Sequence, residues 1–340
     1  MKKIPVEEAV GSVLCHDITQ IIPGKVKDRA FKKGHIITEE DVPVLLSLGK
    51  DHIYVWEKKE GYLHENEAAH RLANLAGGEG LSFSEVKEGK INFIADFDGL
   101  LKIDTKTLLE LNSLGEIILA TRHNNYPVKK GQKVAGTRVI PLVIEEEKII
   151  KAEKIAAGKD IVKVIPFKKF KAGMVNTGNE IYYGRIKDRF GPVVERKLAE
   201  YECEIIDQKI VPDDSEKIAG SIEELIFKGA EMIICTGGMS VDPDDVTPSG
   251  IKKAGGEIVS YGAPVLPGAM FLLAYKEGIP ILGLPGCVMY SKTTIFDLVL
   301  PRVLAEDEIT QKDIAAYGHG GLCVECESCK YPACSFGKGW

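Results

Sequence analysis

Short apolar runs alternate with amphipathic stretches from about residue 160 to residue 305. The apolar runs end at glycine, proline or short polar side chains, which is typical of buried strands. In one amphipathic stretch, Ile218, Ile222 and Leu225 fall on a single face of a predicted helix. The alternation predicts an α/β domain with a mostly parallel sheet and helices on both faces. Strands are expected in KAGMVNTG, CEIIDQKIV, EMIICTGG, GEIVSY, AMFLLAY and PILGL, and helices over residues 188–201, 215–228, 245–254 and 290–304.

The first half of the chain has shorter patterns, which predict two smaller regions. Residues 1–57 combine a turn at Gly34, an apolar helix pattern and a final strand, as expected for a small α+β module rich in β-structure. Residues 58–155 alternate apolar and polar positions between glycine and proline turns, which predicts a mainly β domain with helical inserts. The α/β domain then covers residues 160–305, and residues 306–340 form a cysteine-rich, metal-binding tail.

The composition excludes several classes of protein. The 340-residue chain has a formal net charge of −6, so no global basic field would collect the phosphates of a nucleic acid. No apolar run approaches the roughly 20 residues that span a bilayer. The N-terminal residues also lack the apolar region of a signal peptide. We therefore expect a cytoplasmic protein without nucleic-acid or membrane partners.

Residues 232–248, MIICTGGMSVDPDDVTP, carry the strongest functional signal. An apolar strand leads directly into Thr236, Gly237 and Gly238, and a helix start follows at Asp245. A glycine turn between a strand and a helix N-terminus aims backbone N–H groups at an anion such as phosphate. The aspartates of the same block would repel a bare phosphate, so we expect a divalent cation between them.

Three further loops have a similar character, and each of them follows a predicted strand. In an open α/β sheet, ligands bind beyond the carboxyl ends of the strands, so these loops should converge with the glycine block at one edge. The four loops are residues 176–180 (NTGNE), 211–215 (VPDDS), 236–238 (TGG) and 283–286 (GLPG).

The order of these motifs resembles the molybdopterin-binding domain. TGNE, VPDD, TGGMSVDPDDVTP, the pair Pro267 and Gly268, and GLPG follow one another as they do in that family. The family includes the molybdenum-insertion proteins of molybdenum cofactor biosynthesis and smaller adenylyltransferases, and the resemblance covers roughly residues 160–305. It implies a three-layer α/β/α fold in which the loops hold molybdopterin or its adenylylated form. Because the insertion proteins act as dimers, it also implies a homodimer.

Two aspartates can be carried over individually from the family pattern. Asp213 stands at the aspartate of the family's VPD motif, and Asp245 stands at the aspartate before Val-Thr-Pro. Both belong to the metal-assisted chemistry proposed for the family, so the resemblance assigns them a catalytic role. Two carboxylates would hold Mg²⁺ beside molybdate and phosphate, which are both anions. The alternative is structural, because each aspartate also stands where it could cap the following helix.

The remaining candidate cofactor ligands lie in the same loops. The hydroxyl groups of Thr177, Thr236 and Ser240 can donate hydrogen bonds to phosphate oxygens. The N–H groups of Gly237 and Gly238 can support them at the helix N-terminus. The resemblance adds four positions from the first and last loops, namely Gly178, Glu180, Pro285 and Gly286.

Two positions depart from the pattern of the insertion proteins. Ala269 follows the Pro-Gly pair where a lysine is usual, and Cys287 follows GLPG where an asparagine is usual. The first change removes a cation from the anion site. The second replaces an amide, which can bond in two directions, with a thiol that is a weak donor. Both changes favour cofactor binding over efficient molybdate insertion.

The tail carries four clustered cysteines. Cys323, Cys326, Cys329 and Cys334 have the spacing C-x2-C-x2-C-x4-C, which lets four thiolates fold around one centre. Either a [4Fe–4S] cluster or a tetrahedral Zn²⁺ satisfies this spacing. The alternative is a disordered tail with free thiols, although exposed free thiols are a chemical liability.

These features lead to three functional hypotheses. In the first, the protein binds molybdopterin and acts in molybdenum cofactor biosynthesis or delivery, with Mg²⁺-assisted insertion of molybdate as the transferase reaction and a molybdoenzyme as recipient. In the second, it is a non-catalytic molybdopterin carrier or a redox-responsive sensor. In the third, it is a nucleotide pyrophosphatase of the competence-associated type, which uses a similar domain.

Overall fold

The computed structural model describes residues 2–22, 26–55, 60–240 and 242–339. The boundary that the sequence predicts between residues 57 and 58 therefore lies outside the described residues. Within the described ranges, no helix combines the length and the apolar character that crossing a bilayer requires. The chain divides into two compact units, the first made of Met1–Asp96, Ile103–Arg122 and Gly131–Lys163, the second of Phe97–Lys102, His123–Lys130 and Val164–Trp340.

The N-terminal part of the first unit is rich in β-structure and buries its own apolar cluster. Leu14, Ile37 and Leu45 are among the residues at the centre of this cluster. β1 pairs with β4 and β2 pairs with β3, in both cases antiparallel. The elements are β1 (Lys2–Pro5), η1 (Val6–Glu8), β2 (Ile18–Ile22), β3 (Val26–Phe31), α1 (Asp41–Ser47) and β4 (His52–Val55).

The following part of the chain combines small antiparallel sheets with three helices. β6, β7, β11 and β9 form a four-stranded sheet, β12 pairs with β5, and β8 lies between β10 and β13. Arg71 on α2 donates hydrogen bonds to Glu146 and Glu153 on α4, which ties these two helices together. The elements are β5 (Tyr62–His64), α2 (Glu65–Ala76), β6 (Leu81–Phe83), β7 (Ile91–Ala95), β8 (Gly99–Ile103), α3 (Thr105–Asn112), β9 (Ile117–Thr121), β10 (Tyr126–Val128), β11 (Lys133–Val139), β12 (Val143–Glu145), α4 (Glu146–Ala156) and β13 (Val162–Pro166). The predicted β-rich N-terminal half is confirmed.

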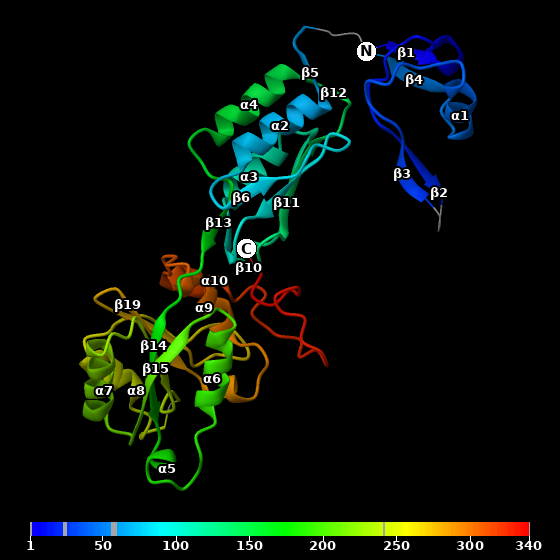
Figure 1. Cartoon of the computed structure of the whole chain (residues 1–340). Helices are drawn as coiled ribbons and strands as arrows, with labels where there is room; N and C mark the ends of the chain where they lie inside the picture. The colour runs from blue at the N-terminus through cyan, green and yellow to red at the C-terminus, as the bar shows by residue number, and fades with distance from the viewer. Residues whose placement is uncertain (1, 23–25, 56–59, 241, 340) are drawn as a thin grey trace. The chain divides into compact units, whose positions relative to one another are not determined.

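A six-stranded sheet forms the centre of the second unit (Figure 1). Its strands, in the order β15-β14-β16-β19-β18-β17, are β15 (Glu204–Val211), β14 (Lys171–Thr177), β16 (Met232–Thr236), β19 (Ile279–Leu284), β18 (Leu272–Lys276) and β17 (Glu257–Tyr261). The first four strands are parallel, and β18 is antiparallel to both of its neighbours. β17 therefore runs in the same direction as β19. The predicted mostly parallel sheet is confirmed.

Helices cover both faces of this sheet, as the alternation of side chains along the strands requires. Met174 and Ile234 point into the apolar cluster that includes α6 (Phe190–Ala199) and α9 (Ile295–Leu304). Their neighbours in sequence, Val175 and Ile233, point into the cluster on the opposite face. There α7 (Ser215–Phe227) and α8 (Thr247–Lys253) supply the covering layer, so the predicted three-layer α/β/α fold is confirmed. Shorter helices complete the unit, namely α5 (Asn179–Tyr182), η2 (Gly286–Met289) and α10 (Gln311–Ala316).

The final apolar helix begins later than the sequence pattern predicts. A helix is expected from residue 290, but α9 starts at Ile295 because Thr294 and Asp297 form a capping box. The Thr294 hydroxyl accepts from the N–H of Phe296 at 3.2 Å, and the Asp297 carboxylate accepts from the N–H of Thr294 at 2.7 Å. The expected start at residue 290 is wrong. Residues 290–294 instead form a connection between η2 and α9.

Candidate functional site

The loops that carry the candidate residues meet at one edge of the sheet. They follow β14, β15, β16 and β19, which are parallel and hydrogen-bonded in series. The last residues of these strands are in register, since Thr177 lies opposite Val211 and Thr236 lies opposite Leu284. The carboxyl ends of the four strands are therefore level, and the loops leave the sheet side by side, as the sequence predicts.

The turn after β16 has a geometry that only glycine permits. Gly237 and Gly238 have φ angles of +83° and +55°, and a Cβ on Gly237 would lie 2.1 Å from the carbonyl oxygen of Thr177. The Thr247 hydroxyl donates to the Gly237 carbonyl at 2.9 Å, and it lies 3.1 Å from the Thr177 hydroxyl. The glycine block is thus held against the end of β14 by close backbone approach and by Thr247.

Asp213 links two of the loops and lies in the electrostatic field of a third. Its Oδ2 atom accepts a hydrogen bond from the N–H of Asn179 at 2.9 Å. Burial raises the pKa of Asp213 above its usual value, and the negative charges of Glu180, Asp245 and Asp244 raise it further, while the Asn179 bond opposes the shift. Acidic side chains from the loops after β14, β15 and β16 are therefore close enough to influence one proton.

Helix capping does not account for the two candidate aspartates. The cap of α7 is Asp214, whose Oδ1 atom accepts from the N–H of Glu216 at 2.9 Å and from that of Lys217 at 3.4 Å. α8 begins after Val246 and has no side-chain cap. The neighbouring Asp242 lies in a turn, because its carbonyl accepts from the N–H of Asp245 at 2.9 Å. Neither aspartate therefore caps the helix that follows it, and the capping alternative is wrong for both.

Buried polar atoms without partners lie at the same edge. Among the described residues, both amide atoms of Asn176 and the hydroxyl of Thr236 lack a hydrogen-bond partner, although both side chains are fully buried. The two residues are opposite each other in the β14–β16 register, so their side chains share one face. Buried polar groups are normally paired, so these unpaired atoms can take a bound water molecule or a polar ligand as their partner.

The other candidate ligands differ in their access to solvent. Thr177, Gly178 and Pro285 are buried, whereas Glu180, Ser240 and Gly286 are exposed. The exposed residues can contact a ligand directly. The buried residues hold the backbone of the loops in place.

Sequence reasoning missed three residues of this edge. Asn176 and Thr247 lie inside motifs that the sequence analysis quotes, but neither was singled out. Tyr261, at the end of β17, donates to the carbonyl of Met239 at 3.0 Å. Burial and the negative charge of Asp245 raise the pKa of its hydroxyl, which places this group in the same acidic field. The sequence did contain a signal for Tyr261. It is the last residue of a predicted strand, GEIVSY, and strand ends at this edge of the sheet carry the other candidate residues.

The two departures from the family pattern are also visible. Ala269 is exposed and offers no cation. Cys287 is half-buried, and burial raises the pKa of its thiol, so the group stays protonated at neutral pH. It remains the weak donor that the sequence analysis anticipates.

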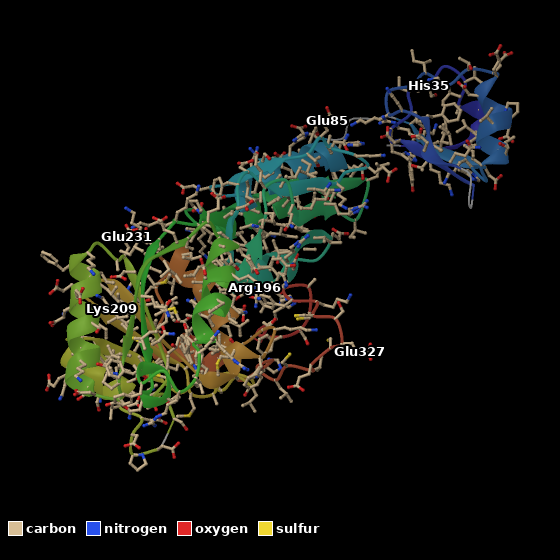
Figure 2. The ribbon with its side chains drawn as sticks, turned by 60° about the horizontal axis from the view of Figure 1, so that its bottom comes forward. His35, Glu85, Arg196, Lys209, Glu231 and Glu327 are labelled. Atoms are coloured by element: carbon tan, nitrogen blue, oxygen red, sulfur yellow. The ribbon has the colours of Figure 1, made fainter. Side chains whose placement is uncertain are left out.

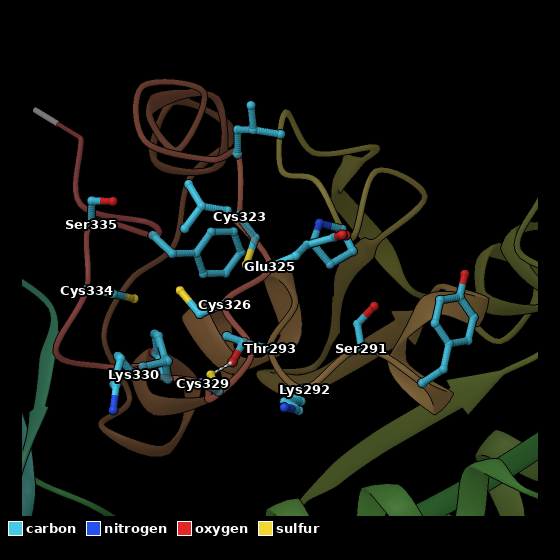
Figure 3. Close-up of a pocket in the computed structure, with 16 residues that line it drawn as sticks. Ser291, Lys292, Thr293, Cys323, Glu325, Cys326, Cys329, Lys330, Cys334 and Ser335 are labelled. Atoms are coloured by element: carbon cyan, nitrogen blue, oxygen red, sulfur yellow. Dashed lines mark hydrogen bonds between the residues drawn. The ribbon is translucent and has the colours of Figure 1, made fainter.

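The four tail cysteines line a single cavity of about 350 Å³ in the second unit (Figure 3). Cys323 and Cys334 are half-buried, while Cys326 and Cys329 are exposed. In the part of the chain that the structure describes, no three His, Cys, Asp or Glu side chains form a group that could hold a metal ion. The thiols thus line a common cavity without being gathered at one point.

Comparisons with known proteins support the site at the sheet edge. Residues 173–305 match the family described as "Probable molybdopterin binding domain", a range that contains all four loops. Residues 3–57 match a domain of unknown function.

Individual relatives cover parts of the chain. Molybdopterin molybdenumtransferase from Haemophilus influenzae is 26% identical over 185 residues, which are 52% of this chain and 43% of that protein. The chain therefore spans less than half the length of this relative. Molybdopterin adenylyltransferase from Pyrococcus furiosus is 30% identical over 95 residues, which are 28% of this chain and 56% of that protein. A molybdopterin biosynthesis protein from Pyrococcus horikosii superposes with a TM-score of 0.34 at 15% identity, covering 90% of this chain and 74% of that one. The part of the chain that is similar to these proteins is therefore the α/β domain, whose residues 173–305 match the probable molybdopterin binding domain.

Proposed function

We propose that the sheet edge binds molybdopterin or its adenylylated form, and that the protein acts in molybdenum cofactor biosynthesis or delivery. One observation carries this proposal: the loops after three adjacent parallel strands, β14, β15 and β16, bring Glu180, Asp213 and Asp245 into one electrostatic field beside a glycine turn. The match of residues 173–305 to the molybdopterin-binding family supports it.

Different residues of this edge would bind different parts of the cofactor. The N–H groups of Gly237 and Gly238 and the exposed hydroxyl of Ser240 suit the terminal phosphate of the cofactor. The unpartnered groups of Asn176 and Thr236 offer a donor and acceptors to a polar ligand or to a water bound with it. Binding of this kind would hold the cofactor across the ends of several strands.

A magnesium ion fits the donor chemistry of the edge. Mg²⁺ is commonly held by one or two carboxylates and completed by water and by phosphate oxygens of the substrate, so a third protein carboxylate is not required. Asp213 and Asp245 are the residues that would hold it. When bound, the ion would supply charge stabilisation to the oxygen that leaves or attacks during molybdate insertion. The surrounding loops would orient the cofactor phosphate and exclude water.

Further proposals concern the tail and the partners of the protein. The four tail cysteines are assigned a [4Fe–4S] cluster or a Zn²⁺ ion, and their spacing and common cavity support this assignment. A homodimer and delivery of the cofactor to a molybdoenzyme stay predictions from the family resemblance.

Anaerobic titration of the full chain with molybdopterin, with and without Mg²⁺, tests the proposal. We expect binding that Mg²⁺ strengthens, and we expect Asp245→Asn to weaken the Mg²⁺-dependent part by about tenfold or more, since it removes one of few carboxylate ligands. Asp242→Asn is the matched control, because Asp242 is an exposed turn residue of the same block and should have no effect.

The outcomes separate the three hypotheses. Release of AMP from adenylylated molybdopterin that depends on molybdate would support the transferase reaction. Tight binding without turnover, unchanged in Asp245→Asn, would support the carrier or sensor. Hydrolysis of free dinucleotides without affinity for the pterin would reject the proposed function.

A further inference from the structure

The tail is an ordered loop that is fastened at its base. The N–H of Cys323 donates to the carbonyl of Leu266 at 2.8 Å, and the N–H of Gly337 donates to the carbonyl of Gly320 at 2.9 Å. Phe336 is buried in the apolar cluster beside α9. Residues 320 and 337 therefore meet, and the four cysteines lie in the loop that this contact closes. These contacts give the tail a defined path, while its four cysteines are free thiols, as the alternative from the sequence expects.

A second set of contacts fixes the middle of the loop against α9. The Tyr331 hydroxyl donates to the carbonyl of Asp297 at 2.7 Å. Lys338, near the end of the chain, donates to the carbonyls of Pro332 and Cys334. The loop thus approaches its cavity with a defined path, and this lowers the ordering entropy that binding of a metal would otherwise cost.

The tail cysteines are in a different environment from the core cysteines. Cys235 is fully buried in the sheet, and burial raises its pKa to about 12, which makes it an inert thiol. Cys326 and Cys329 are exposed, and lysines at positions 292 and 330 line the cavity beside them. These exposed thiols can reach a ligand in the cavity, whereas the buried core thiol cannot.

The floor of the cavity is the connection between η2 and α9. Ser291, Lys292 and Thr293 line it from below. The Thr293 hydroxyl lies 3.1 Å from the sulfur of Cys329, a bond drawn in Figure 3, and the Lys292 ammonium donates to the carbonyl of Glu327 at 2.8 Å. These two contacts join the cysteine loop directly to residues 290–294.

The segment that ends in this connection, residues 286–294, leads back to the sheet edge. It starts at Gly286 of the GLPG loop and turns at once, since the N–H of Val288 donates to the carbonyl of Pro285 at 3.1 Å and that of Ser291 to Cys287 at 2.8 Å. One short, hydrogen-bonded segment therefore has its first residues in the candidate pterin site and its last residues in the cavity wall.

We infer that the four tail thiolates hold one metal centre, either Zn²⁺ or a [4Fe–4S] cluster, and that loading of this centre fixes residues 286–294. Four thiols lose their protons as their sulfurs bind the metal, and the Thr293 hydroxyl then donates to the Cys329 sulfur. The loop closes on the cavity and holds Lys292 and Thr293 in place. Because this segment begins in the candidate pterin site, fixing it also makes that part of the site more rigid. This last step rests on the proposed function.

Metal analysis of the full chain, purified without oxygen, tests the centre itself. We expect about one zinc, or about four irons with four sulfides and visible absorbance, per chain. Cys326→Ser should lose most of this metal. Glu327→Gln is the matched control, because the Glu327 side chain is exposed on the same loop and points outward (Figure 2) while its backbone carbonyl is retained. Absence of metal after reconstitution with Zn²⁺, or with iron and sulfide, would overturn the inference.

Hydrogen exchange of residues 286–294, measured without any pterin, tests the coupling. Exchange in the loaded protein should be about tenfold slower than in protein stripped by a chelator, in line with ordinary coupling energies. Thr293→Val and Lys292→Met should keep the metal but lose most of this difference. Equal exchange rates in loaded and stripped protein would reject the coupling.

Molybdopterin titration of the loaded and the stripped protein then separates this inference from the proposed function. Tighter binding to the loaded protein supports both. If the loaded protein shows slower exchange but has no affinity for molybdopterin, the metal centre and its effect on residues 286–294 are supported and the proposed function is rejected. Equal molybdopterin affinity in both forms would reject the link between the two sites.

Discussion

The glycine block of the sheet edge and the cysteine cavity of the tail are built in different ways. In the glycine block the backbone sets the geometry, since Gly237 has a φ of +83° and lies against the carbonyl of Thr177. In the tail, a few side-chain contacts set it, such as the Thr293–Cys329 pair and the bond from Lys292 to the tail backbone. The glycine turn is therefore formed without a ligand, whereas the cysteine cavity is the site that a metal would complete under the inference above.

This difference determines what a substitution should change. At a site made by the backbone of a folded sheet, a substitution changes the free energy of unfolding even in the absence of ligand. At a site completed by a metal, a substitution changes the metal content, and stability follows only through the lost binding energy. The predictions below use this contrast, starting with the largest expected effect.

Gly237→Ala should be the most damaging change. The new Cβ would lie 2.1 Å from the carbonyl oxygen of Thr177, and a φ of +83° is unfavourable for L side chains. Because the contact is with backbone, the turn or the end of β14 has to move. We expect the free energy of unfolding to fall by about 3 kcal/mol or more, measured by chemical denaturation of the ligand-free protein.

Gly220→Ala is the matched control for this change. Gly220 lies within α7, has no positive φ, and no heavy atom lies within 4 Å of its Cβ position. Alanine is the better helix former, so the free energy of unfolding should rise by about 0.5–1 kcal/mol. Similar small effects in both variants would contradict the idea that the backbone preforms the glycine block.

Lys197→Met tests whether the folded domain, rather than the tail, holds the connection that the two sites share. The Lys197 ammonium is buried, pairs with Asp297 and donates to the carbonyl of Lys292 at 3.1 Å. Methionine would leave the carboxylate without its cation, so the free energy of unfolding should fall by roughly 3 kcal/mol. Metal content should stay unchanged, because no tail contact is removed.

An exposed lysine provides the comparison for this loss. Lys253 pairs with Glu216 at 2.6 Å on the surface of α8, and Lys253→Met should cost less than about 1 kcal/mol. Denaturation curves of the two variants, with zinc and iron analysis of the same samples, check both statements. Loss of metal in Lys197→Met would show that the connection and the tail form one cooperative structure.

The sheet and the meeting of its loops could be predicted from the sequence because both follow from local patterns. Apolar runs separated by helices imply parallel strands, and parallel strands place their following loops at one edge. The contacts within that edge could not be predicted in the same way. The bond between Thr177 and Thr247 joins residues 70 positions apart, and nothing near either residue in the sequence indicates its partner.

The cysteine tail shows the same limit. The spacing of Cys323 to Cys334 predicts that the thiols share one space, and they do line one cavity. Spacing does not indicate which segment forms the floor of that cavity. The start of α9 is a different case, since Thr294 and Asp297 have the spacing of a capping box, and this local signal predicts the observed helix start better than the apolar pattern does.

Asp213→Asn should have the smallest effect, and its sign distinguishes a ligand site from a structural aspartate. The pKa of Asp213 is raised by burial and by the neighbouring acids, so the folded protein disfavours the charged form. Stability is therefore unaffected below the unfolded pKa of about 3.9 and decreases as pH rises through the raised folded pKa. Asparagine does not titrate, and its side-chain oxygen can still accept from the N–H of Asn179.

The variant should therefore be more stable than the original protein at neutral pH, by less than about 1 kcal/mol, and equally stable near pH 4. Thermal unfolding between pH 4 and pH 8 measures this, and Asp242→Asn, at an exposed turn residue of the same block, is the control. Addition of Mg²⁺ with phosphate should reverse the order, because the charged aspartate binds the cation more tightly than the neutral amide of asparagine does. If Asp213 served the fold alone, Asp213→Asn would be less stable than the original protein at every pH. Mg²⁺ would then not change which of the two proteins is more stable.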